Sequence, residues 1–121
     1  MKKLTLSMAA ALLMTGIFVV HPQSRIFTGE ITDSRCGMTG THASLIETSR
    51  ECTLECVRAG AKFVLYDPAK QRVYGLDNQR LPEGFAGTQV EVIGVLDPAT
   101  RVIHVLTMGP ATENAQLVKT N

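Results

Sequence analysis

Three cysteines and one histidine lie within 21 positions of the sequence, at Cys36, His42, Cys52 and Cys56. Thiolates and imidazoles are the ligands that zinc prefers, and thiolate-rich sites also hold copper(I). Cys52 and Cys56 are four residues apart, which places both on one face of a helix. The four side chains therefore predict a tetrahedral Cys3His metal site, although their spacing differs from that of paired C-x2-C zinc knuckles.

The same cysteines also fit a structural disulfide that joins Cys36 to Cys52 or to Cys56 and leaves one thiol over. Closing a loop of roughly 15–20 residues in this way is worth about 3 kcal/mol in the chain-entropy model. A third alternative makes one cysteine a nucleophile with His42 as its base. Because no C-x-x-C pair or other catalytic motif accompanies it, we expect no enzyme activity.

A single helix is expected to carry the second and third cysteines. The pattern predicts this helix over 49–59, with Gly60 as its terminator. At 100° per residue, Cys52, Cys56 and Ala59 form a narrow stripe. Thr53 and Val57 flank this stripe, and we expect the two cysteines to face the core rather than the solvent.

Five strands are expected around this helix. Alternating apolar residues predict strands over 26–32, 62–66, 71–76, 88–96 and 101–107. Asp-Pro turns at Asp67 and Asp97 join the second strand to the third and the fourth to the fifth. Glycines inside the strands, Gly29 among them, suit sharp bends. The predicted fold is mainly β, a small five-stranded OB-like barrel with one helix after the first strand, and an open α+β sheet is the alternative.

The start of the chain has the pattern of an export signal. Lys2 and Lys3 precede an uncharged, mostly apolar run over residues 4–20. A basic start followed by an apolar stretch is typical of a secretory leader. We expect residues 1–24 to be a signal peptide or a retained membrane anchor, 25–108 to be the folded domain, and 109–121 to be a flexible tail. The domain is then periplasmic or secreted, or anchored in the inner membrane.

The charge of the chain argues against nucleic acid as a partner. The 121 residues include 12 basic and 11 acidic side chains, and two of the basic ones belong to the leader. The remainder is close to neutral, without the basic surface that binding to phosphate backbones requires. Contact with a membrane is expected only through residues 4–20, if they are not cleaved.

Several segments resemble a group of small exported bacterial proteins of unknown function with OB-like domains. The resemblance rests on TGEITDSRCG at 28–37, ECTLECVRAGAKFVLYD at 51–67, VYGLDNQ at 73–79, FAGTQVEVIGVLD at 85–97 and VIHVL at 102–106. It implies an OB-like barrel in an exported protein and brings no established activity.

The sequence thus favours an exported, noncatalytic OB-like domain that binds an unknown protein or small ligand and needs no cofactor. The alternative is a periplasmic metal-binding protein that holds zinc or copper through Cys36, His42, Cys52 and Cys56. A thiol-redox protein is the third hypothesis.

The Cys3His hypothesis makes a direct prediction for His42→Ala. Because the imidazole supplies one of four ligands, the variant is expected to carry less metal than the wild type, measured by elemental analysis of the purified protein. An unchanged metal stoichiometry would contradict a role for His42 as a ligand.

Overall fold

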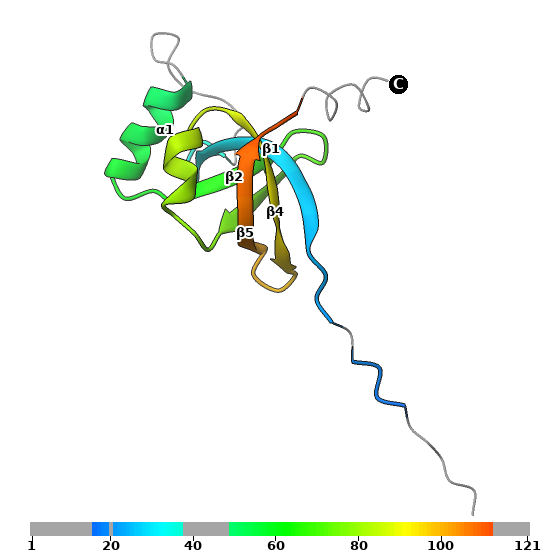
Figure 1. Cartoon of the computed structure of the whole chain (residues 1–121). Coiled ribbons are helices and arrows are strands. Elements are labelled where there is room, and N and C mark those ends of the chain that lie inside the picture. Colours follow the sequence, from blue (N-terminus) through cyan, green and yellow to red (C-terminus); the bar gives the residue numbers. More distant parts are fainter. Residues whose placement is uncertain (1–15, 20, 38–48, 113–121) are drawn as a thin grey trace, which may run out of the picture.

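A computed structural model describes residues 16–19, 21–37 and 49–112 of the chain. This part contains five strands and one α-helix, so the prediction of a mainly β domain with a helix after its first strand is confirmed (Figure 1). In chain order the elements are β1 (Arg25–Asp33), α1 (Ser49–Arg58), β2 (Phe63–Asp67), β3 (Arg72–Leu76), the 3-10 helix η1 (Leu81–Phe85), β4 (Gln89–Asp97) and β5 (Val102–Pro110). Within the same residues, no helix has the length and apolar character needed to span a bilayer.

The strands pair in a ring with the order β1-β2-β3-β5-β4, and β4 pairs back with β1. Four of the pairings are antiparallel, which includes both predicted hairpins, β2–β3 and β4–β5. The pairing of β3 with β5 is parallel and joins the two hairpins. Because every strand has two partners, none of the five presents an open edge along its whole length.

Strand β1 bends so that it can serve two partners. It pairs with β4 over residues 25–30 and with β2 over residues 30–33. Gly29 lies at the changeover, where a Cβ atom would sit 2.2 Å from the carbonyl oxygen of Tyr66. Glycine is required here because only a residue without a side chain lets the β2 backbone come this close.

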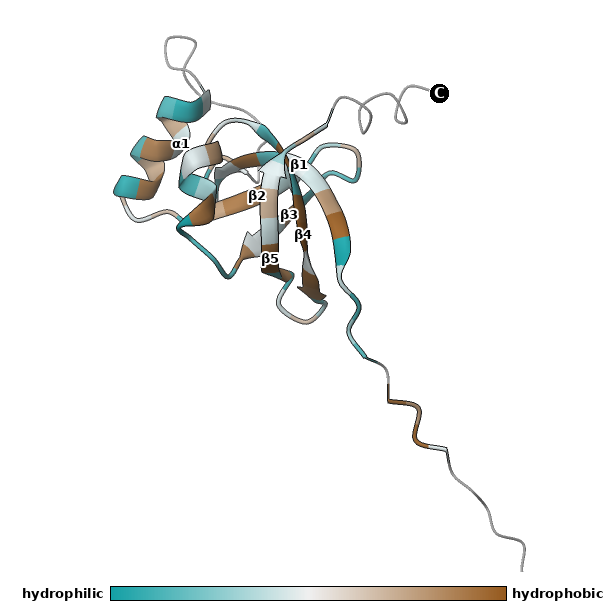
Figure 2. Cartoon of the chain, in the orientation of Figure 1, coloured by the Kyte–Doolittle hydropathy of each residue, from teal (hydrophilic) through white to brown (hydrophobic). Residues whose placement is uncertain are grey.

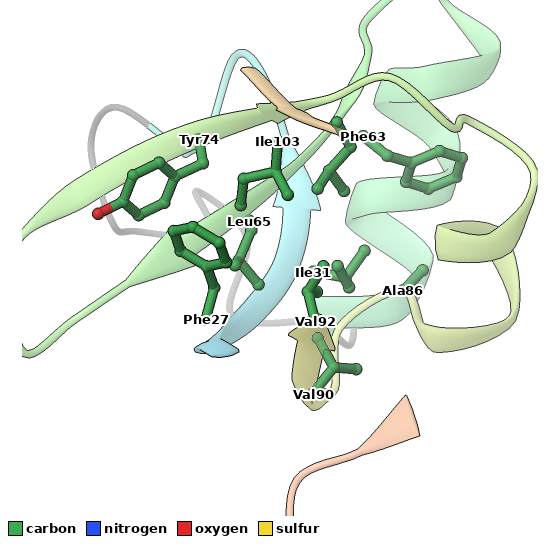
Figure 3. Packing of buried hydrophobic residues seen from close by; sticks show 10 residues of the cluster. Phe27, Ile31, Phe63, Leu65, Tyr74, Ala86, Val90, Val92 and Ile103 are labelled. Carbon is green, nitrogen blue, oxygen red and sulfur yellow. The ribbon is translucent and has the colours of Figure 1, made fainter. Parts of the chain in front are cut away.

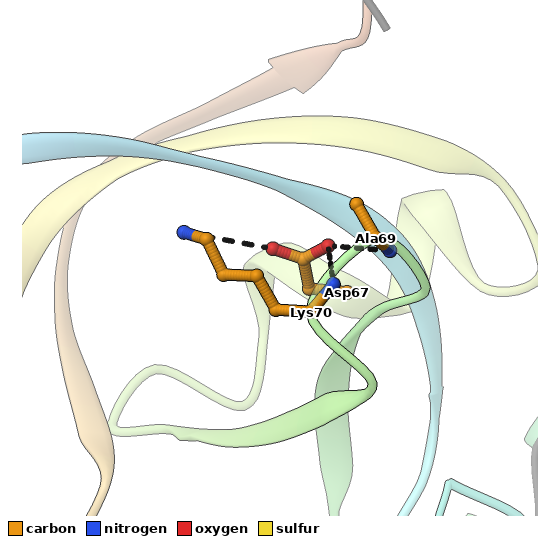
Figure 4. A network of polar contacts seen from close by, with 3 residues as sticks. All are labelled: Asp67, Ala69 and Lys70. Atoms are coloured by element: carbon orange, nitrogen blue, oxygen red, sulfur yellow. Dashed lines mark hydrogen bonds and ion pairs between the residues drawn. The ribbon is translucent and has the colours of Figure 1, made fainter.

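Both hairpin turns are built by an aspartate that binds backbone amides. Asp67 Oδ1 accepts hydrogen bonds from the amides of Ala69 (3.0 Å) and Lys70 (3.3 Å), and Lys70 Nζ lies 3.8 Å from Oδ2 (Figure 4). Asp97 repeats the arrangement, with Oδ1 2.8 Å from the Ala99 amide. The predicted Asp-Pro turns are therefore confirmed, and each fixes the register of the hairpin it closes.

The ring encloses one apolar core, to which all five strands contribute (Figure 3). Phe27 and Tyr74 meet edge to face, with ring centroids 5.4 Å apart. The buried hydrophobic residues of the cluster are Phe27, Ile31, Phe63, Leu65, Tyr74, Leu76, Ala86, Val90, Val92 and Ile103. Side chains from all five strands pack together here, so this core supports the strands that lead to the cysteines.

Helix α1 packs on this core through Thr53, which is fully buried, and through Leu54 and Val57, which are half-buried against the core cluster. Cys52 and Cys56 are half-buried as well, whereas Glu51, Glu55 and Arg58 are exposed. The prediction that the two cysteines face the core is therefore confirmed in part, because neither is fully buried. Ala59, the last residue of the predicted stripe, is exposed. Figure 2 shows the alternation of hydrophilic and apolar bands along α1.

Strand β5 runs further than the sequence pattern predicts. It continues to Pro110 because β4 remains available as a partner as far as Val90, which pairs with Pro110. The Ala111 amide adds a hydrogen bond of 3.1 Å to the Gln89 carbonyl. Residues 113–121 of the predicted tail, and residues 1–15 and 20 of the predicted leader, lie outside the described residues.

The close approach at Gly29 predicts a large effect of a single methyl group. We expect Gly29→Ala to lower the free energy of unfolding by about 3 kcal/mol, measured by urea denaturation, because the new Cβ pushes β1 away from β2. Gly109→Ala is the matched control, since nothing lies within 4 Å of its Cβ position. Equal effects of the two substitutions would contradict this account of the β1 bend.

Candidate metal centre

Cys36 is presented by a tight turn directly after β1. Asp33, the last residue of the strand, accepts hydrogen bonds on Oδ1 from the amides of Arg35 (2.9 Å) and Cys36 (3.0 Å). Its carbonyl oxygen accepts a third from the Gly37 amide at 2.8 Å. An aspartate that binds the amides two and three residues ahead stabilises a turn locally, so the sequence D-S-R-C-G itself fixes where Cys36 lies.

This turn is tied to the chain that leaves α1. The Ser34 amide donates to the Lys62 carbonyl (2.8 Å), and the Lys62 amide donates back to Ser34 Oγ (3.1 Å). The Arg35 guanidinium reaches the Ala59 carbonyl near the end of the helix at 3.2 Å. These bonds hold the end of α1 against the turn, and they bring Cys36 next to the two cysteines of the helix.

The three cysteine sulphur atoms form a compact group. Their Sγ atoms all lie within 4.8 Å of one another, and each residue is half-buried. None of the three takes part in a disulfide, so neither predicted pairing of Cys36 is formed in this structure. A tetrahedral zinc ion with Zn–S bonds of about 2.3 Å needs sulphur atoms about 3.8 Å apart. The sulphur atoms therefore need to approach one another by at most about 1 Å to bind such an ion.

The surroundings of the cluster disfavour negative charge on the sulphur atoms. Burial, followed by the charge of Asp33 and the nearness of Cys52, raises the pKa of the Cys36 thiol to about 12. Burial and the Asp33 charge likewise raise the pKa of Cys56. Without a cation these thiols stay protonated at neutral pH and are weak nucleophiles. A bound metal ion reverses the balance, because its positive charge stabilises the thiolates.

Two polar atoms near the cluster are buried without a hydrogen-bond partner among the described residues. One is Oδ2 of Asp33, whose side chain is fully buried, and the other is Oγ1 of Thr53, which follows Cys52 in α1. A buried carboxylate oxygen without a partner is costly, and positive charge placed nearby would offset that cost. The sequence analysis did not name Asp33 among the metal ligands, and the signal that could have drawn attention to it is its place three residues before Cys36.

The remaining histidine of the predicted site is not described, and other polar side chains of the domain take structural roles. His42 lies outside the described residues, so its part in a Cys3His site stays a prediction. Asp77 forms an ion pair with the exposed His104 and accepts a hydrogen bond from the Val105 amide at 2.9 Å. Burial alone would raise the pKa of Asp77, but the Val105 amide and His104 together lower it. This pair links the end of β3 to β5.

Gln79 also serves the fold. Its side-chain amide binds both the N–H and the carbonyl of Phe63, at 2.8 and 3.0 Å, and the Leu76 carbonyl at 3.0 Å. It therefore fastens the connector after β3 to the first residue of β2. Two surface clefts of about 260 and 310 Å³ adjoin it, and no cysteine lines either.

No model of a known protein family, no curated protein and no solved structure matches this chain. The resemblance to small exported OB-like proteins remains an expectation from the sequence. What the chain does is therefore inferred from the geometry of the cysteine cluster.

Proposed function

We propose that this protein is a noncatalytic metal-binding domain that holds one thiophilic ion through Cys36, Cys52 and Cys56. The observation that carries the proposal is the grouping of three sulphur atoms within 4.8 Å, drawn from two separate elements of the fold. Two of them come from successive turns of α1 and the third from the turn after β1. The fold thus gathers three thiols from separate parts of the chain at one place, as a thiolate metal site requires.

The donor set favours zinc or copper(I). Thiolates are soft ligands that select these ions over magnesium, calcium and manganese, which prefer oxygen. The half-buried position of the three cysteines lets an ion enter from solvent or from a donor protein. Three protein ligands also leave room for one more, and His42 is the candidate that the sequence supplies.

The rest of the fold serves this site as a scaffold. The ring of strand pairings, with its single parallel pair, supports the proposal of an OB-like barrel. The filled core supports β1, and the end of β1 begins the turn that holds Cys36. Metal binding thus takes place at the periphery of the barrel, where α1 packs on it.

The chemistry of the thiols is the reason for proposing binding rather than catalysis. A cysteine nucleophile or redox-active cysteine needs a lowered pKa, whereas burial and Asp33 raise the pKa of Cys36 and Cys56. The apolar run at 4–20 supports an exported domain, either released into the periplasm or beyond or anchored in the inner membrane. Its partner is then a protein or small molecule that delivers or accepts the ion.

The proposal predicts one metal ion per chain and a requirement for every cysteine. Zn²⁺ titration of the fully reduced protein, followed by calorimetry, is expected to saturate at one equivalent. Cys36→Ser, Cys52→Ser and Cys56→Ser are each expected to weaken binding by more than about 100-fold, because loss of a ligand costs more than loss of a supporting group.

Glu55→Gln is the matched control, since Glu55 lies on the exposed face of the same helix and pairs with Arg58. It is expected to leave zinc affinity unchanged. Absence of saturable binding to the reduced wild type, or zinc affinity equal to that of the wild type in the three serine variants, would overturn the proposal.

A further inference from the structure

Asp33 lies next to the cysteine cluster and also forms the turn that presents Cys36. Its side chain is fully buried, and Oδ1 already accepts the amides of Arg35 and Cys36. The carboxylate also contacts the Cys36 thiol through a hydrogen bond and interacts electrostatically with Cys56. Oδ2 is buried and accepts no hydrogen bond from the residues that the structure describes.

Among the residues that the structure describes, no cationic side chain forms an ion pair with Asp33. The ion pairs of the described residues join Arg58 to Glu55, Lys70 to Asp67 and His104 to Asp77, and none reaches Asp33. The Arg35 guanidinium points instead to the Ala59 carbonyl. A buried carboxylate without a cationic partner is destabilising, so the neighbourhood of the three thiols is one in which added positive charge is stabilising.

We propose that Asp33 is a positioning residue that sets the charge preference of the cysteine site, so that the site favours a divalent thiophilic ion over a monovalent one. This inference rests on the proposed function, because it concerns the same site. Asp33 does not belong to the group of ligand atoms that lie within 4.8 Å of one another, so it acts through its charge on Cys36 and Cys56 rather than as a ligand.

The physical basis is that a Coulomb interaction grows in proportion to the charge of the ion. The attraction of the Asp33 carboxylate to a divalent ion is twice its attraction to a monovalent ion at the same place. Three thiolates and Asp33 together carry four negative charges, of which a monovalent ion neutralises one and a divalent ion two. The divalent ion therefore leaves less uncompensated negative charge in a half-buried site.

Asp33→Asn removes the negative charge of the side chain and retains the turn. Asparagine has the same shape and keeps an Oδ1 atom that accepts the two amides, so the position of Cys36 is retained. Asp33→Ser is a second neutral variant, whose hydroxyl also supports such a turn. Asp67→Asn is the matched control, because Asp67 is equally an amide-binding turn aspartate, and its partner is Lys70.

The experiment compares Cd²⁺ with Ag⁺, which are isoelectronic, redox-inert and thiophilic ions of different charge, and each ion is compared with itself across the variants. Affinities for the reduced full chain are measured by competition with a chromophoric chelator at one pH. Asp33→Asn is expected to weaken Cd²⁺ binding by about 10–100-fold, as loss of a group supporting the ligands does. Ag⁺ binding is expected to fall by roughly the square root of that factor. Asp33→Ser is expected to follow Asp33→Asn, and Asp67→Asn to leave both affinities unchanged.

Equal losses for the two ions, or no loss for either, would overturn the role of Asp33 in selectivity while leaving the metal site intact. A wild type that binds neither ion would overturn the proposed function itself. Circular dichroism of each variant verifies that the fold is retained, and Asp33→Ser keeps the test decisive if the asparagine variant does not fold.

Discussion

The division of β1 between two partner strands is the constraint on which the rest of the structure depends. The first part of β1 pairs with β4, the last part pairs with β2, and Gly29 permits the bend between them. This sharing closes the ring of strands around one core, and it also determines where β1 ends. The strand ends at Asp33, where it pairs with β2 and lies near α1. The bend of β1 therefore determines both the closure of the fold and the placement of the candidate site.

Asp33 connects the fold to the chemistry. One of its oxygens holds the turn that presents Cys36, and the other is buried without a hydrogen-bond partner among the described residues. Burial and the Asp33 charge raise the pKa of the Cys36 and Cys56 thiols. A cation bound at the thiols would offset the cost of the buried Asp33 charge, and this is the basis for proposing ion binding rather than catalysis.

Most of the elements could be predicted from the sequence, whereas the site could be predicted only in part. Alternating apolar residues and the two Asp-Pro turns predicted the strands and hairpins because these signals are local. The cysteines were correctly placed on one helix, but the depth of their burial was not predicted, since the sequence does not reveal what Leu54 and Val57 meet. The nearness of Cys36 to Cys56 arises from tertiary packing, which residue spacing alone does not contain. The same is true of the Asp33 oxygen that has no hydrogen-bond partner among the described residues.

The state of the three cysteines in the protein isolated from its own cells tests the central claim most directly. Intact mass is measured under native conditions and again after denaturing alkylation without reductant. A site that holds an ion through Cys36, Cys52 and Cys56 predicts a native mass increased by one metal ion and three alkylated cysteines. One alkylated cysteine with no added metal mass would contradict it, because Cys36 would then be joined to Cys52 or Cys56 in a structural disulfide.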